Sequence, residues 1–314
     1  MYSAKIDERG EDRDIAHRVH LPGPEPAIVR PVEIRDSEKP AIVTAFDAGY
    51  ARSGLVANWL ASVRRVGLAD QVVLFPMDLE AAQYARATGV ETVELWPEVI
   101  PTTDSITPYA AADFKAVSLR KMDAIRHVLA QGRTVLFSDA DIVFLRDPFP
   151  MLAEFAEEIV AQSDVPPNRR LSAPRGILPR WFQRRRCRNT LCAGFLRVRA
   201  TSATLRVFDT AREDVGRFCN DQTLLHDRLV WRAEASWALL PQDEFPNGAY
   251  LAMARWRRGN QAMLNDAVIV HVNWCLSERK IELLKELGLW HAGGGVRNFR
   301  TPPVTESPEV YESS

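Results

Sequence analysis

Short apolar runs alternate with longer helical patterns in the first half of the chain. Short β-branched runs predict strands that are apolar on both faces, at residues 41–46, 71–75, 90–95 and 134–137. Apolar residues at helical spacing predict helices between these strands, at residues 54–66, 79–88 and 111–130. Because right-handed crossovers join such units, this half predicts a parallel sheet flanked by helices, whose ligands bind at the carboxyl ends of the strands.

The pattern becomes mixed after Pro148. Further strands are predicted at residues 159–162, 191–198, 237–240 and 267–272, and helices near 151–157, 204–218 and 222–229. Apart from one basic segment, nothing in the middle of the chain resembles a linker, so we expect one α/β domain over residues 39–291. Residues 1–38 and 292–314 are polar and show no period, which predicts an N-terminal arm and a C-terminal tail.

Composition narrows the class of protein. The 314 residues are 46% hydrophobic and 26% charged, with a net charge of −1, which excludes a fibre, a disulfide-rich mini-protein and a wholly disordered chain. No apolar run reaches the roughly 18 residues of a membrane-spanning helix. The N-terminus is charged, and the four cysteines show no metal-ligand spacing. We therefore expect a cytoplasmic protein with free thiols.

The basic segment is the main departure from this ordinary composition. Eight arginines and no acidic residue lie between Arg169 and Arg188. Such a segment attracts anions. It contains only two aromatic residues, Trp181 and Phe182, and the remaining chain carries no basic excess, so nucleic-acid binding is not expected.

A pair of aspartates, Asp139 and Asp141, follows the predicted strand at residues 134–137. Asp12 and Asp14 also form an Asp-x-Asp triplet, and such triplets arise by chance in a chain of this composition. Only the later pair lies between two apolar runs. Alternate residues of an extended chain point to one side, about 6.6 Å apart at ~3.3 Å per residue. Both carboxylates can therefore reach one divalent cation. Helix capping or pairing with arginine is the structural alternative.

A second candidate ligand is His271, which ends the apolar run at residues 267–270. A single histidine in such a place is more often a buried structural residue than a ligand. Two carboxylates and one imidazole together, however, suit Mn²⁺ better than Ca²⁺.

Several short motifs occur in an order that resembles a known enzyme family. They are Thr44-Ala45-Phe46, Tyr50, Asn58-Trp59, Lys121, Ser138 to Pro148, Gly194-Phe195, Asp221-Gln222, Phe245 to Gly248, and His271-Val272-Asn273-Trp274 with Lys280. Over about residues 40–290 the chain resembles the nucleotide-diphospho-sugar transferases of glycosyltransferase family 77 and, more distantly, the glycogenin-like family 8. It departs from their pattern at Leu191 to Gly194, where a polar residue usually precedes the glycine, and at Ser277, where glycine is common.

The resemblance implies a GT-A fold with a nucleotide-binding half at about residues 39–148 and an acceptor and metal half at about 149–291. It implies a nucleotide-sugar donor, usually a UDP-hexose or UDP-pentose, with Mn²⁺ or Mg²⁺ bridging the diphosphate. The sugar would pass, with retention of configuration, to a hydroxyl of a glycan, protein, lipid or small molecule. The segment Arg169–Arg188 would flank the site and bind the diphosphate, an anionic acceptor or acidic lipid headgroups, or be a solvated loop.

The same resemblance assigns roles to individual residues. Asp139, Asp141 and His271 would be the metal ligands, and Asp139 would also contact the ribose. Lys280 would stabilise the leaving diphosphate, and Asp221 and Gln222 would face the donor sugar, with front-face transfer as the expected mechanism. The remaining donor contacts would be Thr44, Ala45 and Tyr50 at the nucleoside, Asp78 at the base or ribose, and Lys121, Gly194 and Asn273 around the sugar and phosphates.

Structural alternatives stay open for several of these residues. Tyr50 could be a core aromatic, Lys121 and Lys280 could be surface lysines, and Asp221 could serve only to favour a helix N-terminus. For the whole protein, the alternatives are a non-catalytic relative that binds a sugar nucleotide or glycan and a polyanion-binding protein that uses the segment Arg169–Arg188.

Overall fold

The computed structural model describes residues 39–96, 114–164, 191–218, 220–251, 264–275 and 278–292. At their centre lies a seven-stranded sheet with strand order β3-β2-β1-β4-β7-β6-β8. Its strands are β1 (Ala41–Phe46), β2 (Val72–Pro76), β3 (Glu91–Thr92), β4 (Val135–Ser138), β6 (Ile159–Ser163), β7 (Leu191–Val198) and β8 (Trp237–Leu239). Within these residues β7 runs against both neighbours and the other pairings are parallel. The expected α/β fold, mainly parallel with a mixed C-terminal half, is confirmed.

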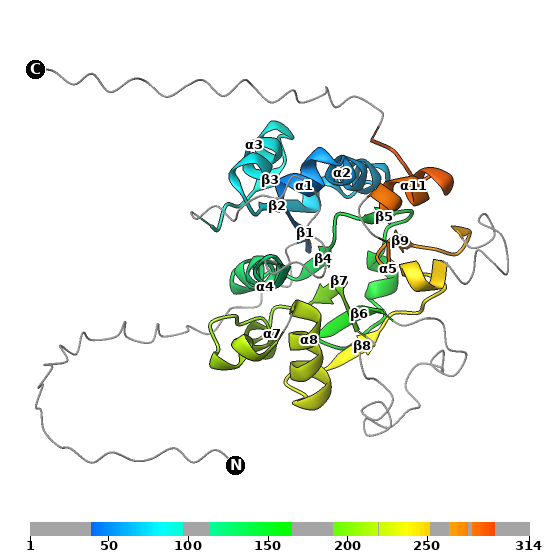
Figure 1. The fold of residues 1–314 in the computed structure, drawn as a ribbon. Helices are drawn as coiled ribbons and strands as arrows, with labels where there is room; N and C mark the ends of the chain where they lie inside the picture. The colour runs from blue at the N-terminus through cyan, green and yellow to red at the C-terminus, as the bar shows by residue number, and fades with distance from the viewer. Residues whose placement is uncertain are drawn as a thin grey trace, which may run out of the picture. The chain divides into compact units, whose positions relative to one another are not determined.

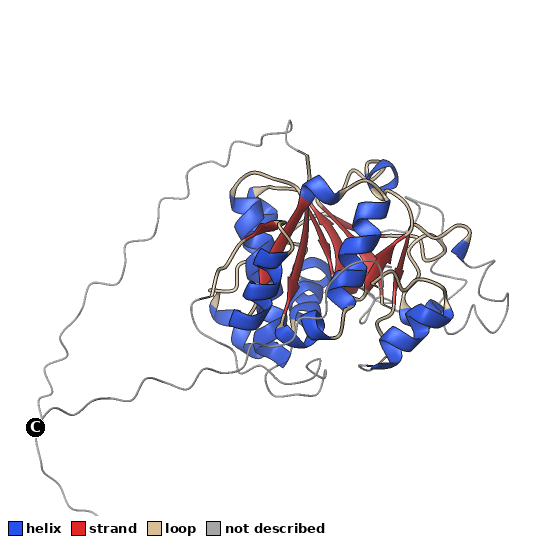
Figure 2. Ribbon diagram, turned by 90° about the horizontal axis from the view of Figure 1, so that it is seen from above, coloured by secondary structure: helices blue, strands red, loops and turns tan. Residues whose placement is uncertain are grey.

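Helices cover both faces of this sheet, which Figure 2 shows from above with the strands between two groups of helices. The helices are α1 (Ala48–Arg52), α2 (Leu55–Arg65), α3 (Leu79–Ala87), α4 (Phe114–Ala130), α5 (Phe149–Leu152), α7 (Ser202–Val207), α8 (Asp221–His226) and α11 (Glu278–Glu286), with short helical turns η1 (Ala69–Gln71), η2 (Glu213–Arg217) and η3 (Asp227–Trp231). Along β1, Val43 and Ala45 belong to the core under α4, α7 and α8, whereas Ile42 and Phe46 belong to the core under α2 and α3. This burial on both faces explains why the strands are continuous apolar runs.

A second, two-stranded sheet pairs β5 (Ile142–Phe144) with β9 (Ile269–His271) in antiparallel orientation. Its register places Ile142 opposite His271. Figure 1 shows β5 and β9 beside α11, whose Leu284 packs in one cluster with Val143 and Val270. The second sheet therefore brings the C-terminal part of the chain to the loop that follows β4.

The carboxyl edge of the large sheet gathers the loops that carry the candidate residues. Because β7 runs in the opposite direction, its amino end lies where β4 and β6 end, with Phe195 opposite Ser138 and Leu191 opposite Ser163. Asp139 follows β4 at this edge and its amide donates to the Gly194 carbonyl at 2.8 Å. Ligands of parallel sheets bind at such an edge.

Some predicted elements differ from the structure. The helix expected at 151–157 is a single turn, α5, which ends at Leu152, and the helix expected at 204–218 is divided into α7 and η2. Helices α1 and α11 and strand β5 were not predicted. The five residues of α1 are too few to show a helical period, and α11 is mainly charged, with Leu283 and Leu284 as its buried residues.

Three expectations fall partly or wholly outside the described residues. The segment Arg169–Arg188 lies outside them, as do the arm at 1–38 and most of the tail at 292–314. The two expected halves share the large sheet, and the domain boundaries stay predictions. In the part of the chain that the structure describes, no helix is long and apolar enough to cross a membrane.

Candidate active site

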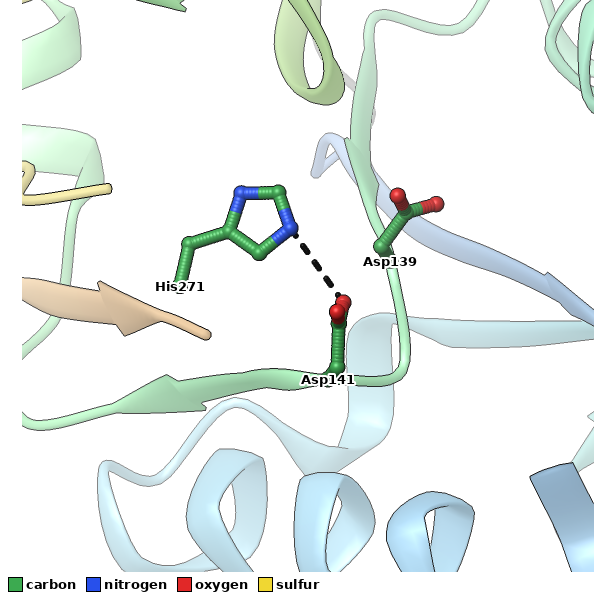
Figure 3. A group of neighbouring side chains, drawn as sticks. All are labelled: Asp139, Asp141 and His271. Atoms are coloured by element: carbon green, nitrogen blue, oxygen red, sulfur yellow. Dashed lines mark ion pairs between the residues drawn. The ribbon is translucent and has the colours of Figure 1, made fainter. Parts of the chain in front are cut away.

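Two aspartates and a histidine converge at the carboxyl edge of the sheet. Figure 3 shows Asp139 and Asp141, from the loop between β4 and β5, with His271 at the end of β9. One ligand atom from each residue lies within 4.8 Å of those of the other two. The three residues that the sequence predicted as metal ligands are therefore brought together.

The inner atoms of this group fit a divalent cation. His271 Nε2 and Asp141 Oδ1 lie 3.2 Å apart, and neither has a hydrogen-bond partner among the described residues. Both side chains are almost fully buried, and unpartnered polar atoms are costly in such a place. Two carboxylate oxygens and one imidazole nitrogen are ligands that suit Mn²⁺ or Mg²⁺.

Gly194 of β7 leaves the space into which two of these side chains fit. A Cβ at this position would lie 2.5 Å from His271 Cε1 and 2.7 Å from Asp139 Oδ2. Such distances are far inside van der Waals contact. Glycine is therefore required here for close approach of the ligands, which gives a physical reason for the Gly194 motif in the sequence.

Each carboxylate also pairs with a lysine from a different helix. Lys121 of α4 lies 2.6 Å from Asp139 Oδ1, and Lys280 of α11 lies 2.8 Å from Asp141 Oδ2. Burial favours the neutral forms of both lysines, but the facing carboxylates outweigh burial and raise the pKa of each. Burial would raise the pKa of Asp141, but Lys280 and His271 hold it well below its usual range. Both lysines are therefore charged members of the site and not surface residues.

Tyr50 of α1 completes the side of the site nearest Lys280. Its hydroxyl accepts a hydrogen bond from Lys280 Nζ at 3.2 Å, and the same Nζ lies 5.5 Å from the centre of the tyrosine ring. The Asp47 side chain caps α1 by accepting from the Tyr50 amide at 2.9 Å. This cap fixes where the short helix begins and thereby positions Tyr50.

The outer nitrogen of His271 is held by Gln162, a residue that the sequence did not single out. Gln162 lies on β6, is fully buried, and donates through Nε2 to the carbonyls of Phe245 and Pro246, both at 3.1 Å. Its Oε1 therefore faces His271 Nδ1, at 2.7 Å. Because an amide oxygen can only accept, Nδ1 carries a proton. Burial opposes the charged ring, but Asp141 raises the pKa of His271 to about 10, so Nε2 is the nitrogen that loses its proton when a metal binds.

A second residue missing from the predictions, Asp164, joins three residues of the predicted motifs. Its Oδ2 accepts from Gln222 Nε2 at 2.9 Å, and its Oδ1 accepts from Asn273 Nδ2 at 3.0 Å and Trp274 Nε1 at 3.1 Å. Asp164 follows β6 just as Asp139 follows β4. Its position after a buried strand was the signal available in the sequence.

Asp221 is the first residue of α8 and is nearly buried. Burial raises its pKa to about 6, with Lys121 opposing this rise and Asp139 adding to it. Asn220, one residue earlier, is the residue that caps α8, and its side chain accepts from the Thr223 amide at 2.8 Å. Asp221 therefore lies in the electrostatic field of the site and is not the helix cap.

Three other predicted donor contacts are buried residues. Both oxygens of Asp78 accept from backbone amides, of Ala48 and Ala81, each at 2.8 Å, so this carboxylate caps α3 and ties it to α1. Thr44 and Ala45 are buried in β1. Their contact with a nucleoside stays a prediction.

Comparison with known proteins identifies the family. Residues 67–284 match the model of the nucleotide-diphospho-sugar transferase family. The chain belongs to this family, and the expected class of enzyme, a glycosyltransferase, is confirmed.

Two curated relatives come from Arabidopsis thaliana. The chain is 24% identical over 281 residues to a protein named UDP-D-xylose:L-fucose alpha-1,3-D-xylosyltransferase, which covers 83% of this chain and 73% of that protein. It is 25% identical over 279 residues to a beta-arabinofuranosyltransferase, covering 83% of this chain and 50% of that protein.

Two solved structures are also similar to the chain. Glycosyltransferase GlyE of Streptococcus pneumoniae TIGR4 is 15% identical with a TM-score of 0.45, and the match covers 81% of this chain and 62% of GlyE. The galactosyltransferase LgtC is 13% identical with a TM-score of 0.45, over 82% of this chain and 98% of LgtC.

Proposed function

We propose that the protein is a metal-dependent, retaining glycosyltransferase that moves a pentose or hexose from a UDP-sugar to a hydroxyl acceptor. The observation that carries the proposal is the convergence of Asp139, Asp141 and His271 with two charged lysines at the carboxyl edge of the sheet. One relative is named for UDP-xylose and L-fucose, which makes these the first substrates to test.

The chemistry requires stabilisation of charge on the departing diphosphate. A Mn²⁺ or Mg²⁺ ion held by Asp139, Asp141 and His271 would neutralise that charge as the bond between sugar and phosphate breaks. Lys280 and Lys121 carry fixed positive charges beside the same carboxylates, and each can donate to a phosphate oxygen or a sugar hydroxyl. The site therefore has the donors that a diphosphate leaving group needs.

Retention follows from the expected front-face path, in which the leaving phosphate takes the proton of the acceptor hydroxyl. Gln222 and Asp221 at the start of α8 would lie along the donor sugar, and Asp164 orients the Gln222 amide. Gln222 carries no charge, which makes its amide oxygen a weak nucleophile, so its role in this proposal is to position the sugar and not to attack it.

The decisive experiment measures donor turnover and metal dependence together. UDP-xylose, UDP-arabinose, UDP-glucose, UDP-galactose and GDP-mannose are incubated with the protein in Mn²⁺, Mg²⁺ or EDTA, and released nucleotide is quantified. We compare the wild type with Asp141→Asn and with a matched control, Asp70→Asn, which removes an exposed carboxylate that pairs with Lys39 at the surface.

The proposal expects turnover of one UDP-sugar that needs the metal, at least about 100-fold loss in Asp141→Asn, and no change in Asp70→Asn. The anomeric configuration of the product, read from its ¹H NMR coupling, tests retention. Metal-dependent donor binding without turnover in any acceptor mixture would favour a non-catalytic relative. Absence of donor binding under every metal condition refutes the proposal.

A further inference from the structure

One aromatic side chain beside the site is displayed to solvent. Trp274 is 63% exposed, the largest exposure of any bulky apolar side chain among the described residues. It follows Asn273, three residues after His271. An indole ring exposed to this degree leaves a large apolar area in contact with water, and a partner that covers this area would gain binding free energy.

The backbone at Trp274 adopts a conformation that its side chain disfavours. Its φ is +45°, in the left-handed region that bulky residues rarely enter. The Cys275 amide donates to the Asn273 carbonyl, which closes a three-residue turn with Trp274 at its centre. Strained backbone of this kind occurs preferentially at functional sites, where it holds a side chain in a needed direction.

Asp164 fixes the direction of the ring. The indole N–H donates to Asp164 Oδ1 at 3.1 Å, and the same carboxylate holds Gln222 and Asn273. The N–H is therefore engaged, and the free part of Trp274 is its apolar ring. Such a ring binds the C–H face of a sugar by stacking and contributes little through hydrogen bonding.

The turn that carries Trp274 lies beside the turn formed by Phe245 to Gly248, and it is linked to the residues of the proposed donor site. The Asn273 side chain accepts from the Gly248 amide at 2.7 Å, so the turn of Trp274 packs on the turn formed by Phe245 to Gly248. A Cβ on Gly248 would lie 2.9 Å from the Asn273 carbonyl oxygen, which shows how close the two turns are. Through Asp164 the same ring is linked to Gln222, which the proposed function places along the donor sugar.

We propose that Trp274 is the stacking platform for the sugar ring of the acceptor, held in place by Asp164. This inference rests on the proposed function, because it assigns the acceptor to that same site. It commits to a pyranose or furanose ring as the group that lies on the indole, and it separates acceptor binding at Trp274 from donor binding at the metal and lysines.

The test compares Trp274→Ala and Trp274→Phe with a matched control, Trp231→Ala, which removes another exposed tryptophan that follows α8. Methyl α-L-fucopyranoside, methyl β-D-xylopyranoside and methyl β-D-galactopyranoside are titrated without donor, with binding followed by saturation-transfer NMR. In parallel, UDP-sugar hydrolysis is measured without acceptor, and the acceptor KM is measured in the transfer reaction.

We expect one glycoside to bind the wild type and Trp231→Ala, and to bind Trp274→Ala about ten-fold more weakly, with Trp274→Phe between them. The acceptor KM should rise by the same factor while donor hydrolysis stays within about two-fold of wild type. Unchanged glycoside binding in Trp274→Ala, or no binding of any glycoside to the wild type, overturns the inference. Glycoside binding that depends on Trp274 without any donor turnover would support the platform and refute the transferase.

Discussion

Replacement of Gln162 by leucine should weaken Mn²⁺ binding without touching any ligand of the metal. In the wild type, Gln162 Oε1 accepts from His271 Nδ1 at 2.7 Å and so keeps the proton on that nitrogen. Leucine has a similar volume but cannot accept, so the proton can move to Nε2 and block the lone pair that faces the carboxylates. Loss of such an orienting partner typically costs about 10- to 100-fold in metal affinity, or about 1.4–2.7 kcal/mol.

The same substitution also removes two hydrogen bonds that hold the fold. Gln162 Nε2 donates to the carbonyls of Phe245 and Pro246, and leucine removes both bonds. The Pro246 carbonyl still accepts from the His271 amide at 3.1 Å, so the expected cost is about 1–3 kcal/mol in all. Gln162→Glu separates the two effects, because glutamate still accepts from His271 but cannot donate to the carbonyls. We therefore expect both variants to lose stability and only the leucine variant to lose metal affinity.

Metal affinity is measured by Mn²⁺ titration followed by electron paramagnetic resonance, and stability by urea unfolding of the metal-free protein. ¹⁵N NMR of the histidine ring gives the tautomer directly, with the proton on Nδ1 in the wild type and in Gln162→Glu. Wild-type Mn²⁺ affinity in a folded Gln162→Leu protein would refute the reasoning, as would equal loss of affinity in both variants.

Three further changes test other parts of the site and fold. Gly194→Ala should weaken Mn²⁺ binding at least about ten-fold, because the new Cβ would lie 2.5 Å from His271 Cε1 and push that ligand away. Lys280→Met should lower the rate of UDP-sugar hydrolysis about 100- to 1,000-fold, measured by steady-state kinetics, and should also weaken nucleotide binding, because Lys280 would face the phosphates. Burial would raise the pKa of Asp214, but the ion pair with buried Arg228, at 2.9 Å, outweighs burial and lowers it. The contribution of this ion pair to the stability of the fold is therefore complete above about pH 4 and is lost as the pH falls. Asp214→Asn should therefore cost about 3–5 kcal/mol at pH 7 and flatten the acid limb of a plot of unfolding free energy against pH.

Each of these expectations has an outcome that contradicts it. A Gly194→Ala protein with unchanged Mn²⁺ affinity would mean that the sheet edge yields to the methyl group. Equal losses of hydrolysis rate in Lys280→Met and in the control Lys285→Met, a lysine one turn further along α11, would remove the special role of Lys280. If the unfolding free energy of Asp214→Asn still fell as steeply at low pH, the loss of stability in acid would come from other carboxylates.

The sequence predicted the local features of this fold because burial on both faces makes strands continuous and apolar. It also predicted that Asp139 and Asp141 act together, since their spacing and their strand context are local properties. His271 could be proposed from its apolar strand, but its distance from Asp141 depends on the pairing of β5 with β9, between segments about 125 residues apart. The prediction that His271 and Asp141 act at one site came from the family resemblance and not from the residue pattern.

Gln162 and Asp164 were missed for a physical reason. Neither residue offers its reactive atoms to a ligand, since each is occupied in orienting other side chains. Such a role depends on three-dimensional contacts between β6, β9 and α8, and the sequence shows only that Asp164 follows a buried strand. The helix predicted at 151–157 failed for the opposite reason, because a local helical pattern does not show where tertiary packing ends a helix.

The charges of the site predict that a divalent cation and a nucleotide-sugar donor would favour each other's binding. Asp139 and Asp141 are each paired with a lysine, so the charges of both carboxylates are already balanced in the absence of ligand. A dication alone would be attracted by the two carboxylates but repelled by the two lysines. A diphosphate alone would be attracted by the lysines but repelled by the carboxylates. Bound together, the cation would be held by the carboxylates and the phosphates by the lysines, so each ligand would remove the repulsion that the other would feel. By linkage, each ligand must then raise the affinity of the other by the same factor. This coupling acts through the two lysines, which the sequence alone left as possible surface residues.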